Sequence, residues 1–198
     1  MTDLVISLGA TNDALVEGNE QYKMVLSNPG TTTVSDITLG TSEVTTTIHD
    51  TTDGTGAALD TATWSITGSA DVNEGANASY TVHLAGTLQA GETATINLAI
   101  ANNTTTSADY ASFVTAVNTA ITGRADLSFN AGTGTLTYTG TGSSMQDVVI
   151  NLAAVNDGLV EGPEQYTVSL SSPGSGTGSS IALDPAQGRM KWHVDVGA

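Results

Sequence analysis

Along most of the chain, apolar and polar residues alternate one by one, which is typical of strands that bury one face. Glycine- and serine-rich pieces such as NAGTGT (130–135) and GTGSSM (140–145) separate these stretches and are expected to form turns. Short strands joined by such turns predict an all-β fold, an antiparallel sandwich. The predicted strands are TWSITG (63–68), ASYTVHLAG (78–86), ATINLAI (94–100), GTLTYTG (134–140), QDVVINLAAV (146–155), EQYTVSLS (164–171) and MKWHVDV (190–196).

One segment departs from this alternation. In SADYASFVTAVNTAITG (107–123), Phe113, Val117 and Ile121 recur every four residues, which is the spacing of one helix face. We therefore expect a short helix in a loop between strands, packed by that face on the sandwich. Its candidate caps are Ser107 or Asp109 at the start and Gly123 at the end. Four aromatic residues alternate with polar neighbours and are predicted to lie in the core: Trp64, Tyr80, Tyr138 and Tyr166.

The sequence also contains an internal repeat. Residues 12–30 match residues 156–174 without gaps, with 13 identities in 19 positions. The same offset extends backwards, where DLVISLGA (3–10) falls on DVVINLAA (147–154). It extends forwards to the segments ITL (37–39) and IAL (181–183).

The repeat divides the chain into two predicted units. Residues 1–58 are interpreted as the carboxy-terminal half of a preceding repeat plus a linker, and residues 59–198 as a complete repeat. A half-sandwich leaves strand edges without a partner sheet. It is expected to dock on the complete unit, to exchange between chains, or to reflect how the sequence was cut, and the sequence leaves these three open. The first residues lack the basic start and long apolar run of a secretion signal, so such a signal is expected elsewhere in a longer protein.

The charge balance is strongly acidic, with 20 Asp and Glu against 4 Lys and Arg and a net charge of −16. Nucleic acid and anionic membranes need basic surfaces, so neither is expected as a partner. No run of 18 apolar residues is present, so no membrane insertion is expected. The chain has no cysteine, and a secreted protein without disulfides has to gain its stability from core size, metal or repetition.

A loop between two predicted strands carries acids in the order D-x3-E-x2-E, and this order occurs twice: Asp157, Glu161 and Glu164, and then Asp13, Glu17 and Glu20. Like charges held together are unfavourable unless a cation lies among them. Carboxylate oxygens, with no cysteine and no histidine at ligand spacing, suit Ca²⁺ better than zinc or copper. The alternative is that Asn156, Asp157 and Gly158 form only an Asx turn, with the two glutamates solvated.

Four stretches resemble the Calx-beta repeats, a family of Ca²⁺-binding, immunoglobulin-like sandwiches. VNEG (72–75), followed by ASYTVHL, is similar to the family's first acidic position and second strand. TTSADY (105–110) is similar to its T-x-x-x-D-Y element, and VNDGLVEGPEQYTVSLSSP (155–173) to its loop-and-strand motif. TTTIHDTTD (45–53) is similar to its closing strand with terminal aspartates. The order and spacing of the four stretches together carry the resemblance.

The resemblance implies an immunoglobulin-like sandwich and assigns Ca²⁺ ligands position by position. In the complete unit these are Glu74, Asp109, Asp157, Glu161 and Glu164, with the carbonyl of Leu159. In the half-unit they are Asp13, Glu17, Glu20, Asp50 and Asp53. The closing acidic cluster departs from the family pattern in the complete unit, where Asp195 stands one place out of register. Extracellular sites of this type have dissociation constants of about 0.1–1 mM.

The composition, rich in Thr, Ala and Gly and poor in Lys, resembles that of large bacterial surface adhesins of the RTX type. The leading hypothesis is an extracellular extender of such an adhesin, rigidified by Ca²⁺ and in contact with neighbouring repeats of the same chain. The alternative is a module at the tip that binds a surface glycan or protein. No enzyme is expected, because no G-x-S-x-G elbow or triad is present. The histidines fall in ordinary strand positions: His49, His83 and His193.

Overall fold

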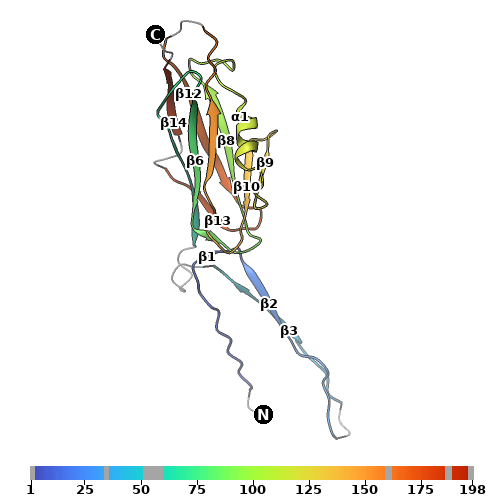
Figure 1. The fold of residues 1–198 in the computed structure, drawn as a ribbon. Coiled ribbons are helices and arrows are strands. Elements are labelled where there is room, and N and C mark those ends of the chain that lie inside the picture. The colour runs from blue at the N-terminus through green and yellow to red at the C-terminus, as the bar shows by residue number, and fades with distance from the viewer. Residues whose placement is uncertain (1–2, 34–35, 51–59, 159–161, 186–188, 196–198) are drawn as a thin grey trace.

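The computed structural model describes residues 3–33, 36–50, 60–158, 162–185 and 189–195. It is elongated: two packed sheets form a sandwich, and an extended amino-terminal segment and a hairpin project from one end of it (Figure 1). Among the described residues, none of the helical structure is long and apolar enough to span a membrane.

The sandwich consists of a six-stranded and a four-stranded sheet. In order across the six-stranded sheet, the strands are β5 (Asp71–Asn73), β14 (Arg189–Asp195), β12 (Glu164–Gly174), β8 (Thr93–Asn102), β10 (Thr135–Thr139) and β9 (Leu127–Asn130). Across the four-stranded sheet they are β11 (Val148–Ala153), β6 (Asn77–Ala85), β4 (Thr61–Gly68) and β13 (Ser180–Leu183). Neighbours are antiparallel except at two edges, where β14–β5 and β13–β4 are parallel. The predicted sandwich is confirmed.

Each of the seven predicted strands is present, because the alternation of apolar and polar residues reports directly which face of a strand is buried. Three edge strands were not predicted. Strands β5, β9 and β13 have only three or four residues, too few to show an alternating pattern.

The core lies between the two sheets and is filled by the inward-facing residues of each alternating strand. On β4, Ala62, Trp64 and Ile66 are fully buried. Tyr80 on β6 and Tyr166 on β12 are also buried, and their hydroxyl oxygens lie 2.5 Å apart, so a hydrogen bond joins the two sheets across the core. Burial raises the pKa of both hydroxyls above the ordinary tyrosine value, which keeps the pair neutral. The four aromatic residues predicted to lie in the core all do so.

The predicted helix is present as α1 (Phe113–Ala120) and packs against β11, with Phe113 and Val117 buried. The predicted caps are wrong. Ser112 is the N-cap, and its hydroxyl oxygen accepts a hydrogen bond from the amide of Thr115 at 3.3 Å. Asp109 instead accepts from the amide of Thr106, which closes a turn before the helix. At the other end the C-cap is Ile121 and not Gly123. Several polar residues precede the helix, and spacing alone does not decide which one caps it.

Residues 3–33 and 36–50 lie outside the two large sheets. Strand β1 (Leu15–Val16) pairs in parallel with β7 (Thr87–Leu88) at the base of the sandwich. Strands β2 (Glu20–Val25) and β3 (Glu43–Ile48) form an antiparallel hairpin that projects away from it (Figure 1). The predicted boundary between the units, at residues 58 and 59, falls within residues 51–59 and therefore outside the described residues.

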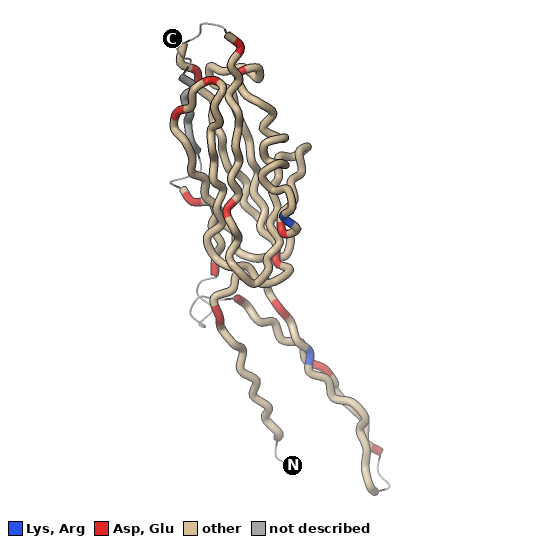
Figure 2. Tube along the Cα trace, viewed as in Figure 1, with Lys and Arg blue, Asp and Glu red and all other residues tan. Residues whose placement is uncertain are grey.

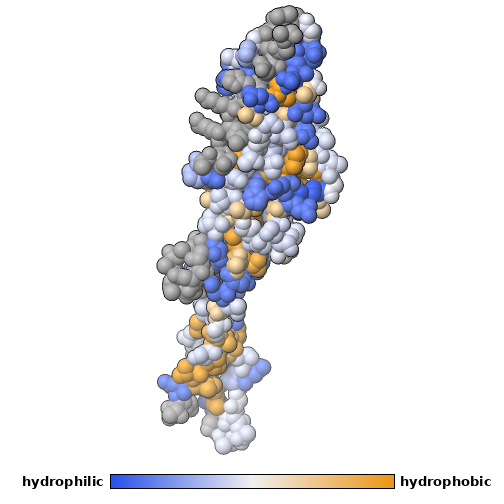
Figure 3. Space-filling model, turned by 60° about the vertical axis from the view of Figure 1, so that its left-hand side comes forward, coloured by the Kyte–Doolittle hydropathy of each residue, from blue (hydrophilic) through white to orange (hydrophobic). Residues whose placement is uncertain are grey.

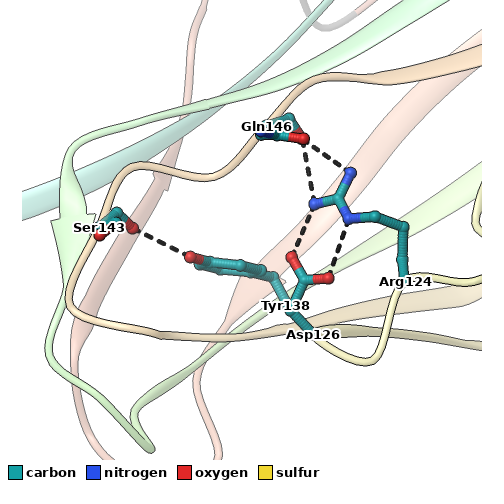
Figure 4. A network of polar contacts seen from close by, with 5 residues as sticks. All are labelled: Arg124, Asp126, Tyr138, Ser143 and Gln146. Carbon is teal, nitrogen blue, oxygen red and sulfur yellow. Dashed lines mark hydrogen bonds and ion pairs between the residues drawn. The ribbon is translucent and has the colours of Figure 1, made fainter.

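A polar network ties the loop after β10 to the turn before β9 (Figure 4). The Arg124 guanidinium donates to both carboxylate oxygens of Asp126, at 2.9 and 2.6 Å, and to the carbonyl oxygen of Gln146 at 3.3 Å. The Tyr138 hydroxyl donates to the carbonyl oxygen of Ser143 at 3.1 Å. The hydrogen bonds from Arg124 lower the pKa of the Asp126 carboxyl below its ordinary value.

Replacing Asp126 by Asn is expected to lower the free energy of unfolding at neutral pH by about 1–3 kcal/mol, because hydrogen bonds between two charged groups are lost. The folded pKa of Asp126 lies below its unfolded value. The ion pair therefore contributes stability above the unfolded pKa, and this contribution disappears as the pH falls through the folded pKa. Urea unfolding of the original protein and of Asp126→Asn, from neutral to acid pH, checks this. The difference between their free energies of unfolding should shrink as the pH falls. Asp3→Asn, at an exposed position, is the control; a difference that is constant with pH contradicts the assignment.

Candidate metal centre

Strand β1 attaches the amino-terminal unit to the base of the sandwich. Val16 is only 2% exposed and belongs to the same buried core as Leu88. The amide of Gln89 donates a hydrogen bond to the Val16 carbonyl oxygen at 3.3 Å, which extends the pairing of β1 with β7. Because Val16 is buried, the residues on either side of it are held in place against the sandwich.

At Gly18, which is buried, the chain comes close to the backbone of the sandwich. A Cβ at this position would lie 2.7 Å from the carbonyl oxygen of Thr177, in the loop between β12 and β13, so a side chain does not fit. At Gly162, the equivalent glycine of the complete unit, a Cβ would meet nothing within 4 Å. The need for glycine at position 18 therefore comes from the docked sandwich and not from the repeated motif itself.

Beside this contact, four carboxylates line one small cavity of about 20 Å³: Asp13, Glu17, Glu20 and Asp50. The amide of Leu15 donates to Asp13 Oδ1 at 2.9 Å, and the amide of Glu17 donates to Asp50 Oδ2 at 2.9 Å. The second hydrogen bond joins the segment before β2 to the segment after β3. The structure thus brings together four of the five acids predicted in the half-unit, and the fifth, Asp53, lies outside the described residues.

Glu17 is partly buried and lies close to several other negative charges. Partial burial raises the pKa of its carboxyl, and four neighbouring negative charges raise it further: those of Asp13, Glu20, Asp50 and Glu92. A raised carboxyl pKa means that the folded protein disfavours the ionised form. A cation among these carboxylates would reverse that effect, because it would favour the ionised form of Glu17.

Glu92 also lies near this group and was not predicted from the sequence. It lies in the turn between β7 and β8, and a Cβ at Gly18 would lie 3.7 Å from its Oε1. Its Oε2 accepts a hydrogen bond from the Ser179 hydroxyl at 2.5 Å, and the Gly140 amide donates to its carbonyl oxygen at 2.7 Å. Only the docking of β1 brings Glu92 near the other acids. Its own sequence surroundings contain no second acid, so spacing carried no signal.

The donor set of the cavity fits a hard cation such as Ca²⁺, because its charged ligands are carboxylate oxygens. A cavity of about 20 Å³ is large enough for one occupant of the size of a water molecule. Among the described residues, no group of three or more acidic or imidazole side chains is close enough to hold a metal ion as it stands. The four carboxylates share the cavity without converging on one point, so binding would require the glutamate side chains to rotate toward the ion.

Several Asp and Glu residues lie at the end of the sandwich opposite the hairpin (Figure 2). The loop that carries Glu74 and the loop that carries Asp109 are both hydrogen-bonded to the segment after β11, over 3.0 and 2.8 Å. Asp157 lies in that segment, and Glu164 opens β12 beside β14. The topology therefore brings these four acids to one end. Two further predicted ligands of this unit lie outside the described residues: Leu159 and Glu161.

Strand pairing gives the position of Asp195, the last predicted ligand. In the complete unit, the partner of the first residue of β12 lies one position before Asp195. In the half-unit, the partner of the first residue of β2 lies two positions before Asp50. Asp195 therefore occupies the position of His49, next to the one that Asp50 occupies.

A family model described as the Calx-beta domain matches residues 1–52 and 70–191. The two matched stretches cover most of the chain and fall on both the amino-terminal unit and the sandwich. Calx-beta domains are immunoglobulin-like β-sandwiches, in agreement with the two sheets described above. The family is non-catalytic and is associated with calcium binding. No curated protein matches the sequence.

Replacing Glu17 by Gln is expected to raise the melting temperature in excess EDTA at neutral pH. The folded pKa of Glu17 is raised, so its ionised form is penalised in the folded protein, and a neutral side chain removes that penalty. This rise in melting temperature should shrink at mildly acid pH, because the Glu17 carboxyl of the original protein then becomes protonated and neutral as well. Thermal melts at both pH values check this, with Asp36→Asn at an exposed position as the control. A lower melting temperature for the Gln variant at neutral pH would contradict the electrostatic assignment.

Proposed function

The chain belongs to the Calx-beta domain family, and on that basis we propose that it is a Ca²⁺-binding structural module, an extender of a long extracellular protein. In this proposal Ca²⁺ stiffens the joint between successive repeats. The observation that carries it is a cavity lined by four carboxylates beside the docked strand β1. The function is then reach and stiffness, without chemical conversion of a substrate.

A cation in the cavity that the four carboxylates line would link the segment around β1 to the segment that follows β3. Asp13 precedes β1, Glu17 and Glu20 follow it, and Asp50 follows β3. Backbone amides already orient Asp13 and Asp50, so the two glutamates would complete the set of oxygen ligands. Ca²⁺ supplies the positive charge that offsets repulsion among these carboxylates. Since β1 is anchored in the sandwich core, linking β1 to the β2–β3 hairpin would limit motion of the hairpin relative to the sandwich.

The free energy of Ca²⁺ binding at such a site is a substantial fraction of the stability of a typical domain. A site with a dissociation constant of about 0.1 mM, in about 100-fold excess of Ca²⁺, contributes roughly 2.7 kcal/mol to stability. Typical domains are stable by only about 5–15 kcal/mol. Without cations, 20 acids against 4 bases repel one another and oppose compact packing. Ca²⁺ would therefore act both locally at the joint and globally on the net charge.

The acidic end of the complete unit supports the same role for a following repeat. Glu74, Asp109, Asp157 and Glu164 lie at one end of the sandwich, and the half-unit places its own acids at the corresponding end, against the base of the next unit. A chain of such repeats would carry a cation site at each joint. An extracellular location, as in a bacterial surface adhesin, fits this design because extracellular Ca²⁺ reaches the millimolar range in which such sites fill.

A second candidate function is recognition of a glycan or protein by a module at the tip of such a protein. The observation that favours it is a groove of about 400 Å³ between α1 and β11, lined by small residues such as Ala116, Ala120 and Ala153. Strand β11 is an edge strand; the Ala111 amide donates to the carbonyl oxygen of Ala153 at its end, and no other strand of the described residues pairs with its outer side. Binding to a panel of surface glycans or proteins that Ala116→Arg abolishes would favour this second function.

Thermal melts in excess EDTA, in CaCl₂ and in MgCl₂ test the proposed function. A gain of roughly 2.7 kcal/mol corresponds to a rise of about 5–11 °C for a chain of this size. We expect such a rise with CaCl₂ and little change with MgCl₂, because Mg²⁺ keeps its water shell and demands octahedral geometry. Identical melts in all three solutions would remove Ca²⁺ from the function.

The variant Glu17→Gln tests whether the rise in melting temperature with CaCl₂ comes from calcium bound beside β1. In EDTA it is expected to be more stable than the original protein, whereas in excess CaCl₂ it should recover less than half of the calcium-dependent rise, because one charged ligand is missing. Asp36→Asn changes the net charge by the same amount at an exposed position and should keep the full rise. An undiminished rise in Glu17→Gln would place the bound calcium elsewhere.

A further inference from the structure

The groove between α1 and β11 runs along a strand edge that offers unused backbone groups. In an antiparallel sheet, alternate residues of an edge strand turn both their N–H and their C=O outward. Ala153 is one of these, because its carbonyl oxygen accepts from the Ala111 amide at 2.8 Å. By the same alternation, Val149 and Asn151 turn their backbone groups outward. Among the described residues, no hydrogen bond reaches these groups from the outer side of β11.

The chain itself begins a further strand at this edge and then leaves it. Residues 109–111 run antiparallel to the end of β11, with Tyr110 opposite Ala154, before the chain turns into α1. At the other end of β11, the Arg124 guanidinium donates to the carbonyl oxygen of Gln146 at 3.3 Å. The unpaired stretch is therefore bounded at both ends by contacts within the chain, and a short strand placed there would continue a pairing that residues 109–111 have started.

The lining of the groove favours a polypeptide over a glycan. Its volume of about 400 Å³ lies in the range of ligand-binding pockets. The strand side is lined by Val149, Asn151 and Ala153, and the helix side by small residues that include Ala116 and Ala120. The described residues that line it include no charged side chain and no aromatic ring on which a sugar could stack. Small apolar walls beside open backbone groups instead suit the main chain and alternate side chains of an extended peptide.

We propose that this groove binds an extended segment of another polypeptide, which adds to β11 as a further antiparallel strand. Its backbone pairs with the outward N–H and C=O groups of Val149 and Asn151. Its alternate side chains are small or β-branched and pack against Ala116 and Ala120 of α1. This proposal rests on the second candidate function above and narrows it from a glycan or protein to an extended polypeptide.

The surface chemistry of the chain indicates how such a segment is attracted and held. On the side that Figure 3 shows, polar residues and residues of intermediate hydropathy predominate on the sandwich, and the apolar ones lie in small patches. Main-chain hydrogen bonds of an added strand need no large apolar patch. The net charge of −16 attracts a partner with basic residues and repels an acidic one. The segment is therefore expected to carry Lys or Arg beside the residues that enter the groove.

Selection from a displayed library of random linear peptides tests the proposal. The chain is the target, and Ala116→Arg, whose long side chain fills the groove, serves for counter-selection. We expect enriched peptides with Val, Ile or Thr at alternate positions and with flanking Lys or Arg. An enriched peptide, titrated into the isotope-labelled protein, should shift the amides of Val149 and Asn151 along a saturable curve. Absence of enrichment over the counter-selection, or saturable shifts confined to other residues, would overturn the proposal.

Two matched pairs of variants separate strand addition from general attraction of a basic peptide to an acidic protein. Asn151→Pro removes an outward N–H without touching the pairing with β6, so it should weaken peptide binding by about tenfold, whereas Asn151→Thr keeps that N–H and should bind normally. Ala116→Arg should abolish binding, whereas Val114→Arg adds the same charge at a residue that is 39% exposed and outside the groove, and should keep it. Thermal melts check that each variant is folded. Equal effects within both pairs would overturn the proposal.

The outcomes also separate this proposal from the functions proposed above. A neutral oligosaccharide that shifts the amides of the groove, where no peptide does, would keep the second candidate function and overturn strand addition. A dimer of the original chain that Asn151→Pro converts to monomers would make a second copy the occupant and would also overturn it. The peptide titration is carried out in EDTA as well as in CaCl₂, so failure of the calcium melts leaves its result unaffected.

Discussion

The burial of Val16 in the core of the sandwich is the contact on which the joint between the two units depends. Strand β1 is only two residues long, yet it places one side chain among the core residues and brings Gly18 against the backbone of the loop between β12 and β13. Two carboxylates beside this anchor are oriented by backbone amides, since Asp13 accepts from Leu15 and Asp50 accepts from Glu17. Glu17 lies among four negative charges, and its partial burial and these charges both raise the pKa of its carboxyl.

A chain with 20 acids and 4 bases has few internal ways to neutralise such a cluster. Of the bases in the described part of the chain, Lys23 pairs with Glu43 and Arg124 with Asp126, both away from the joint. A cation from solution can balance this charge, and a hard cation such as Ca²⁺ suits the four carboxylates of the cavity, which His49 also lines.

The sequence was sufficient for the large strands and for the core aromatic residues, because alternation records burial directly. It failed where the structure depends on contacts between distant segments. The choice of Ser112 over Asp109 as the helix cap depends on the turn that Asp109 closes with Thr106. Glu92 lies near the acidic group only because the other unit docks there, and the residues around it in the sequence form no acidic motif that would predict this. The repeated acidic motif, by contrast, pointed to Asp13 and Glu17 together, because a conserved loop length keeps their spacing in both units.

The most direct measurement is an NMR titration of the isotope-labelled protein with CaCl₂, followed at the backbone amides of residues 13–20. If Ca²⁺ binds at the joint, the amides of Leu15, Glu17 and Gly18 should shift along a saturable curve with a dissociation constant of about 0.1–1 mM. The same amides should respond weakly in Glu17→Gln. Shifts that rise linearly without saturation, or that are spread evenly over all acidic residues, would contradict a calcium site at the joint and leave only general screening of an acidic surface.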